Sequence, residues 1–194
     1  MNRIVVAITL SSAIILPVML SGCASDEAKM EEIARRVAKE EAKAAIQEYA
    51  RSFAPVKFGF GGALENEWSH AQAVKTGNLI FVSGQQPYDT NLDAKGMPLT
   101  DLETGKNFEQ QLATVLENIQ KCLTNYGATM DDVTFLQAFV DEKAGKNVAK
   151  FNNAAAVIKK FFPKAQQAMT FVSVENLFGP EQLIEINAIA VVSK

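Results

Sequence analysis

The alternation of short apolar runs with longer segments of helical periodicity constrains the fold of this chain more than any other feature. Residues 71–74 and 79–83 are short apolar runs that flank a Lys-Thr-Gly-Asn turn, and this pattern predicts a hairpin. Apolar residues then recur at spacings of three and four over residues 108–123, which predicts an amphipathic helix. The remaining predicted elements are a strand, a helix and two more strands at residues 133–140, 148–162, 169–174 and 183–192.

This ββαβαββ order determines how the elements can pack. Helices between strands imply connections that cross over the sheet. A sheet of this size takes both helices on one face and leaves its other face to be covered. We therefore predict an α/β domain with a single sheet and two helices on one face, and oligomerisation would cover the second face.

The first 22 residues have the pattern of a secretory signal. A single cation, Arg3, precedes an apolar stretch, and the segment ends Leu-Ser-Gly before Cys23. This ending resembles the lipobox of bacterial lipoprotein signals, in which cleavage precedes the cysteine and the cysteine is then acylated. The alternative is an uncleaved transmembrane anchor, because the apolar stretch nearly reaches the roughly 18 residues that a span needs. Pro17 and the small residues before Cys23 argue against that alternative.

The predicted lipidation at Cys23 determines the expected location. Acyl chains would hold the mature protein on a membrane while its folded domain stays in the aqueous phase. We therefore expect a lipid-anchored protein of the cell envelope, outside the cytoplasm, and on the periplasmic face of the outer membrane in a Gram-negative host.

A charged helix is predicted at residues 26–51, where thirteen of 26 residues are charged and neither Gly nor Pro occurs. Glu31 and Arg35 are four apart with the acid first, the favourable order for a helical pair. An apolar stripe begins at Met30 but is interrupted by Glu40. We therefore favour a solvated spacer, residues 23–56, over a short trimeric coiled coil. The folded domain is predicted to span residues 57–194.

Several common chemistries lack support in the sequence. Two cysteines and the single His70 do not have the spacing of a zinc site, so we expect no metal. No phosphate-binding loop and no nucleophile-elbow motif occurs, so we expect no nucleotide cofactor and no hydrolase triad. The formal net charge of −3 argues against nucleic acid as a partner. Cys122 is predicted to be a buried, inert thiol.

Several stretches of the C-terminal part are similar to one known family. They are the run AVKTGNLIFVSGQ at residues 73–85, Gln111 with LENI at 116–119, Gly127 with Asp132 and Val133, and LIEINAIA at 183–190. In their order and spacing these stretches resemble the Rid (reactive intermediate deaminase) family, formerly YjgF, over about residues 68–192. The resemblance implies a chorismate-mutase-like α/β fold, a homotrimer, and three ligand clefts between subunits.

The resemblance also implies a reaction. Active members of the family hydrolyse enamines or imines to a 2-keto acid and ammonia, and hold the substrate carboxylate with an arginine. The position of that arginine falls on Met169, which Thr170 follows, and no arginine occurs after Arg51. Lys164 could supply a point charge instead, although most lysines are simply exposed.

Candidate site residues follow from the same likeness. Glu185 matches the family's cleft glutamate, which is thought to position or activate the attacking water. Strand alternation places it on the opposite face from its neighbours Ile184 and Ile186, and a plain edge-strand carboxylate is the alternative. Ser83 matches a cleft serine, and His70 stands where many members have a tyrosine, yet both can equally be structural residues. The candidates are therefore Glu185 for catalysis and, for ligand binding, Ser83, His70, Met169 and Thr170.

Three functions remain open from the sequence. The first is a membrane-tethered trimer that binds a small metabolite between subunits, with deaminase activity lost or altered. The second is a working enamine or imine deaminase that uses Glu185 and water. The third is an envelope scaffold or partner-binding lipoprotein.

Overall fold

The computed structural model describes residues 24–88, 107–144, 148–164, 167–179 and 181–193. The predicted signal segment and Cys23 lie outside the described residues. The chain divides into two compact units, Met1–Glu48 and Tyr49–Lys194, and each is described by itself.

The described part of the first unit belongs to one long helix, α1 (Ala24–Ser52), which confirms the predicted charged helix. Arg35 forms an ion pair of 2.6 Å with Glu31 one turn earlier, on the exposed surface of the helix. Met30 and other apolar side chains of α1 are also exposed. Across the residues that the structure describes, we find no helix with both the length and the apolar character to cross a membrane.

The second unit contains one six-stranded sheet in the order β1-β2-β3-β6-β4-β5. Only β4 and β5 run parallel, as their connection through a helix requires. The fold matches the predicted ββαβαββ order and its single sheet. The strands are β1 (Val56–Phe58), β2 (Ala73–Thr76), β3 (Leu79–Gln85), β4 (Val133–Asp141), β5 (Ala168–Val174) and β6 (Ile184–Val191).

Two elements were not predicted from the sequence. Strand β1 pairs with β2, although its three residues are too few to show an alternation. Helix α2 (Ala63–Trp68) has six residues and follows a glycine-rich segment, so it has no helical periodicity to detect. It ends at Ser69, which adopts the left-handed conformation at φ 52°. Two short 3₁₀ turns, Met130–Asp132 and Glu142–Ala144, flank β4.

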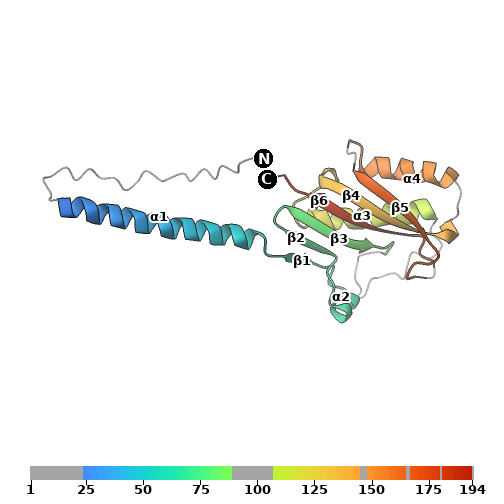
Figure 1. The fold of residues 1–194 in the computed structure, drawn as a ribbon. Coiled ribbons are helices and arrows are strands. Elements are labelled where there is room, and N and C mark those ends of the chain that lie inside the picture. Colours follow the sequence, from blue (N-terminus) through green and yellow to red (C-terminus); the bar gives the residue numbers. More distant parts are fainter. Residues whose placement is uncertain (1–23, 89–106, 145–147, 165–166, 180, 194) are drawn as a thin grey trace. The chain divides into compact units, whose positions relative to one another are not determined.

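Two long helices, α3 (Phe108–Thr124) and α4 (Val148–Phe161), lie on the same side of the sheet (Figure 1). Strand β6 shows how the core forms, because its residues alternate between buried and partly exposed along its whole length. The buried set faces the helices and comprises Ile184, Ile186, Ala188 and Ala190. The other set, which includes Glu185, therefore points to the opposite face, as the sequence predicted.

The sheet face opposite the helices, which we call the open face, carries apolar side chains that are only partly buried. Phe81 on β3 is 44% exposed and pairs across the strands with Ile189, which in turn pairs with Phe135. In the described residues both long helices lie on the other side, so this protomer leaves apolar surface on the open face. A surface of this kind is typical of an interface.

Within the second unit, Ser52 and Phe53 are hydrogen-bonded to the turn between β2 and β3. The amide of Gly77 donates to Ser52 O at 3.1 Å, and the Thr76 hydroxyl donates to Phe53 O at 2.6 Å. Gly77 has φ +57°, and a Cβ there would approach the Phe53 ring to 2.8 Å. The turn therefore requires glycine for its conformation and for the close approach of the ring.

Candidate functional site

The carboxylate of Glu185 is held by two side-chain amides on the open face. Gln86 Nε2 and Gln182 Nε2 each donate to Glu185 Oε2 at 3.1 Å. The other carboxylate oxygen lies directly over Gly84, where a Cβ would overlap it and would meet Cδ at 2.9 Å. The two amide donors and the absence of a side chain at Gly84 therefore fix the position of the half-buried Glu185 carboxylate, whose oxygens can only accept hydrogen bonds when it is ionised.

Helix α3 positions the chain just before Glu185. Gln111, which is buried, donates from Nε2 to Glu181 O at 2.9 Å and accepts from the Leu183 amide at 2.8 Å. Gln182 is fully buried, and its Oε1 accepts from the Gly179 amide at 3.2 Å. These amide contacts fix the entry to β6, so Glu185 starts from a rigid backbone.

A bulge in β3 forms the other wall of the site. The register between β3 and β6 shifts between Val82 and Gln85, which places Ser83 and Gly84 in the bulge. The Ser83 hydroxyl donates to Ala71 O at 2.6 Å, so in this protomer its hydrogen is bound to the backbone and does not point to a ligand. Gln85 is buried and donates to Gln72 Oε1 at 2.9 Å.

A row of polar residues crosses the open face beside Glu185. Gln137 on β4 pairs with Asn187 on β6 and with Thr170 on β5. Asn187 in turn lies beside the bulge at Ser83, because Ala188 pairs with Val82 and Ile186 with Gln85. Asn187 Oδ1 is buried without a hydrogen-bond partner among the described residues. Within the described part of the protomer, this row therefore leaves one buried acceptor unsatisfied.

The predicted site residues do not all meet in one protomer. Glu185, Thr170 and the bulge at Ser83 belong to the open face. Met169 pairs with the buried Leu136, so it lies on the helix side of the sheet, at its edge. A cleft with both Met169 and Glu185 would have to combine residues of two protomers.

His70 and Lys164 contribute little to the site in this protomer. His70 is exposed after α2, and its Nε2 lies 3.5 Å from Gln72 Nε2. Lys164 is exposed after the end of α4. Sequence reasoning missed Gln86, Gln182 and Gln137 as neighbours of the site. Only the resemblance around residues 83–85 pointed near Gln86, and no local pattern marks the other two.

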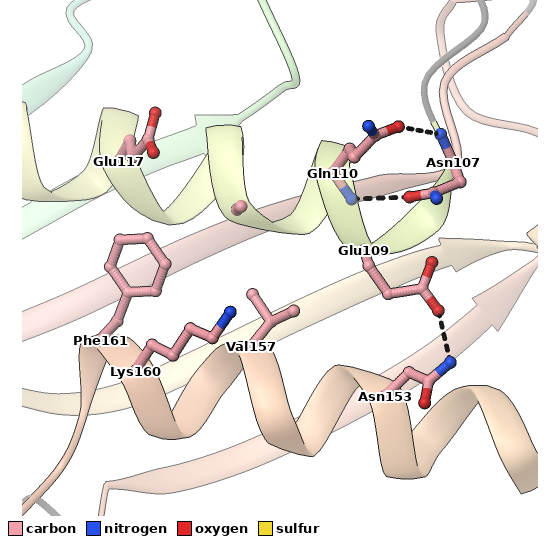
Figure 2. Close-up of a pocket in the computed structure, with 9 residues that line it drawn as sticks. Asn107, Glu109, Gln110, Glu117, Asn153, Val157, Lys160 and Phe161 are labelled. Carbon is pink, nitrogen blue, oxygen red and sulfur yellow. Dashed lines mark hydrogen bonds between the residues drawn. The ribbon is translucent and has the colours of Figure 1, made fainter.

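A second concavity lies on the helix side of the sheet, between α3 and α4. It has a volume of about 670 Å³. Figure 2 shows Glu109 of α3 facing Asn153 of α4, and Asn153 Nδ2 donates to Glu109 Oε1 at 2.8 Å. The capping box of Asn107 and Gln110 closes one end. This groove is separated from Glu185 by the sheet, so it is not part of the predicted site.

Cys122 is fully buried, which confirms the burial predicted for this residue, and its inertness stays a prediction. Burial raises the pKa of its thiol to about 12, and the negative charge of Glu65 adds to the effect. Within the described ranges, no three His, Cys, Asp or Glu side chains gather as a metal site would require.

The comparisons with known proteins agree with this fold. Residues 61–192 match the family described as Endoribonuclease L-PSP. A RutC family protein of Saccharolobus solfataricus is 37% identical over 121 residues, which cover 62% of this chain and 85% of that protein. The 3-aminoacrylate deaminase RutC of Acinetobacter baylyi is 32% identical over 121 residues, with the same coverage of 62% and 85%.

Solved structures show the same architecture. A YjgF family protein from Mycobacterium tuberculosis superimposes with a TM-score of 0.57 at 23% identity, and the match covers 72% of this chain and all of that one. RidA from an Antarctic Psychrobacter gives a TM-score of 0.52 at 25% identity, covering 64% of this chain and 89% of that one. The family match covers more than half of the chain and the fold agrees with it. The chain therefore belongs to the Endoribonuclease L-PSP family, the Rid or YjgF family that its sequence resembles.

Proposed function

We propose that this protein is a membrane-tethered Rid-like trimer that binds a small metabolite at Glu185, with deaminase activity lost or altered. The observation that carries the proposal is the fixed position of the Glu185 carboxylate, held by Gln86 and Gln182 over Gly84. A carboxylate that is fixed by amides can accept hydrogen bonds from the amino or imino group of a ligand.

The missing arginine supports altered chemistry. No arginine occurs between residues 52 and 194, so the domain has no planar cation to bind a ligand carboxylate with two hydrogen bonds. Substrates that depend on that contact would bind weakly. A ligand that carries an uncharged group in place of the carboxylate fits the domain better.

The open face supports a trimer. Its partly exposed apolar side chains, such as Phe81, call for a covering surface. Three copies around one axis would cover these surfaces and would bring Met169 of one protomer toward Glu185 of another. The acylated Cys23 of each copy would then give the trimer three membrane anchors, and multivalent attachment is much stronger than attachment through one anchor.

A second candidate is a working enamine or imine deaminase. A relative named 3-aminoacrylate deaminase is 32% identical to this chain, and Glu185 would act as the base that activates water. The water would add to the imine carbon, and ammonia would leave as the carbonyl of the keto acid forms.

The experiment that separates the two candidates uses an amino-acid oxidase to generate imines in the presence of the protein. The release of keto acid is timed for the unmodified chain and for Glu185→Gln. Binding without hydrolysis predicts no acceleration from either protein. Acceleration that Glu185→Gln abolishes would establish the deaminase instead. No shift of the melting temperature with any member of a panel of small metabolites, uncharged ones included, would contradict the binding candidate.

A further inference from the structure

A buried side-chain amide on α3 holds the segment that carries Gln86. Asn118 is 2% exposed, and its Nδ2 donates to Gln86 O at 3.1 Å and to Tyr88 O at 2.9 Å. A side-chain amide nitrogen carries two hydrogens, so both are used on these two carbonyls. Asn118 therefore binds the chain on both sides of Pro87.

The sheet does not hold this segment by itself. Strand β3 ends at Gln85, where its register with β6 also ends. Gln86 comes next, and Pro87 after it has no N–H to donate to a neighbouring strand. A tight turn replaces the strand here, because the amide of Tyr88 donates back to Gln86 O at 2.8 Å. The position of Gln86 therefore depends on this turn and on the two hydrogen bonds from Asn118.

The turn bears on the site because Gln86 is one of the two donors to Glu185. Gln86 Nε2 and Gln182 Nε2 both donate to the same oxygen, Glu185 Oε2, at 3.1 Å. Two donors on one oxygen fix how the carboxylate is turned, and with it the oxygen that faces a ligand. A shift of the Gln86 backbone would withdraw one donor and let the carboxylate turn.

Helix α3 supports the other donor in the same way. Gln111 lies about two helical turns before Asn118, so the two side chains stand on the same face of the helix. Gln111 binds Glu181 O and the Leu183 amide, which belong to the residues on either side of Gln182. One buried face of α3 therefore holds both segments that donate to the carboxylate.

We propose that Asn118 is a positioning residue for Glu185, which it orients through the backbone of Gln86. The two carbonyls that Asn118 binds set the direction of the Gln86 side chain, and the Gln86 amide then fixes Glu185 Oε2. The inference rests on the proposed function in taking Glu185 as the ligand-binding group. It adds a residue of α3 that controls the orientation of that group without touching the ligand.

The test follows the side-chain amides of Gln86 and Gln182 by nuclear magnetic resonance. The full chain is isotope-labelled on its glutamine side chains and is kept in detergent micelles without ligand. An amide proton that donates to a carboxylate resonates downfield of one that faces water, so each signal reports on its own contact with Glu185. Gln86→Met and Gln182→Met assign the two signals, and Glu185→Ala shows where each signal lies once the carboxylate is gone.

The variants separate positioning from a general loss of packing. Asn118→Ala removes both hydrogen bonds to the turn, and Asn118→Ser is the milder variant because it keeps one donor. Ile119→Val is the matched control, since Ile119 is a fully buried neighbour on α3 whose apolar side chain donates no hydrogen bond. Gln111→Leu is the reciprocal variant, because its contacts lie beside Gln182 and not beside Gln86.

The inference predicts a specific pattern of shifts. Asn118→Ala should move the Gln86 signal most of the way to its position in Glu185→Ala, and should move the Gln182 signal less. Gln111→Leu should reverse this order, and Ile119→Val should move neither signal. A Gln86 signal that stays in place in either folded variant of Asn118, or that moves as far in Ile119→Val, overturns the inference. If both variants of Asn118 fail to fold while Ile119→Val folds, Asn118 supports the whole domain and the specific role is wrong.

The measurement needs no ligand, so its failure can be told apart from failure of the proposed function. If no metabolite of the panel raises the melting temperature but the Gln86 signal moves as predicted, Asn118 positions Glu185 and the binding function is wrong. If a metabolite binds and Glu185→Gln abolishes its binding, while Asn118→Ala leaves the Gln86 signal in place, the binding function stands and this inference is wrong.

Discussion

Substitution of Gly84 by alanine tests how Glu185 is held. Gly84 is outside the positive φ region, so the backbone accepts alanine without strain. The added Cβ would overlap Glu185 Oε1 and lie 2.9 Å from Cδ and 3.1 Å from Cγ, so the carboxylate has to move. Its movement breaks the contacts with Gln86 and Gln182, both 3.1 Å long.

The size of the effect follows from those two hydrogen bonds. Hydrogen bonds to a charged group contribute about 1.5–3 kcal/mol each, and the displaced carboxylate regains part of this from water because it is half-buried. We therefore expect Gly84→Ala to lower the free energy of unfolding by about 1–3 kcal/mol. The melting temperature should fall by about 2–4 °C for each kcal/mol in a chain of this length.

A double-mutant cycle with Glu185→Ala is the assay. Removal of the Glu185 side chain beyond Cβ eliminates the overlap, so Gly84→Ala should then cost nothing or slightly stabilise the protein. The free energy of unfolding is measured by urea denaturation for all four proteins. An equal cost of Gly84→Ala in both backgrounds would show that the alanine acts elsewhere and that Glu185 does not lie over Gly84.

Three further predictions concern stability and reactivity. Gly77→Ala should lower the melting temperature more than Gly127→Ala. Both glycines have positive φ, but a Cβ at Gly77 would meet the ring of Phe53, whereas a Cβ at Gly127 would have open space. Equal falls in melting temperature would contradict the contact between Gly77 and Phe53. Cys122 should resist thiol reagents in the folded state at pH 8, and rapid labelling of the folded protein would contradict its burial. Because burial raises the pKa of the thiol, its contribution to the free energy of unfolding is present in full below the ordinary thiol pKa of about 9 and is lost between pH 9 and 12. Urea denaturation at a series of pH values measures this loss. Gln111→Leu should lower the free energy of unfolding by about 1–3 kcal/mol for each backbone group that loses its contact with Gln111, as urea denaturation would measure. An unchanged free energy of unfolding would show that α3 does not help to position Glu185.

The sequence was most informative where a pattern repeats. The periodicity of residues 108–123 and the alternation around Glu185 depend on local contacts between neighbours in the chain, so they identified α3 and the face of β6. Short elements gave no such signal. Strand β1 exists because it pairs with β2, and three residues alone cannot indicate that pairing.

The site itself depends on contacts between distant segments. Gln86 and Glu185 are 99 positions apart, and only the pairing of β3 with β6 brings them together. The face on which Met169 lies is likewise set by its register with Leu136 on β4. The sequence can indicate Glu185 as a candidate site residue, but the strand register determines which amides bind its carboxylate and which residues share its face of the sheet.

The most direct measurement is a crystal structure of the full chain, together with its sedimentation in solution. The account predicts a trimer in which the open faces are covered by neighbouring protomers and Glu185, still bound by Gln86 and Gln182, lines a cleft between protomers. A chain that crystallises and sediments as a monomer, with Glu185 facing bulk water, would contradict it.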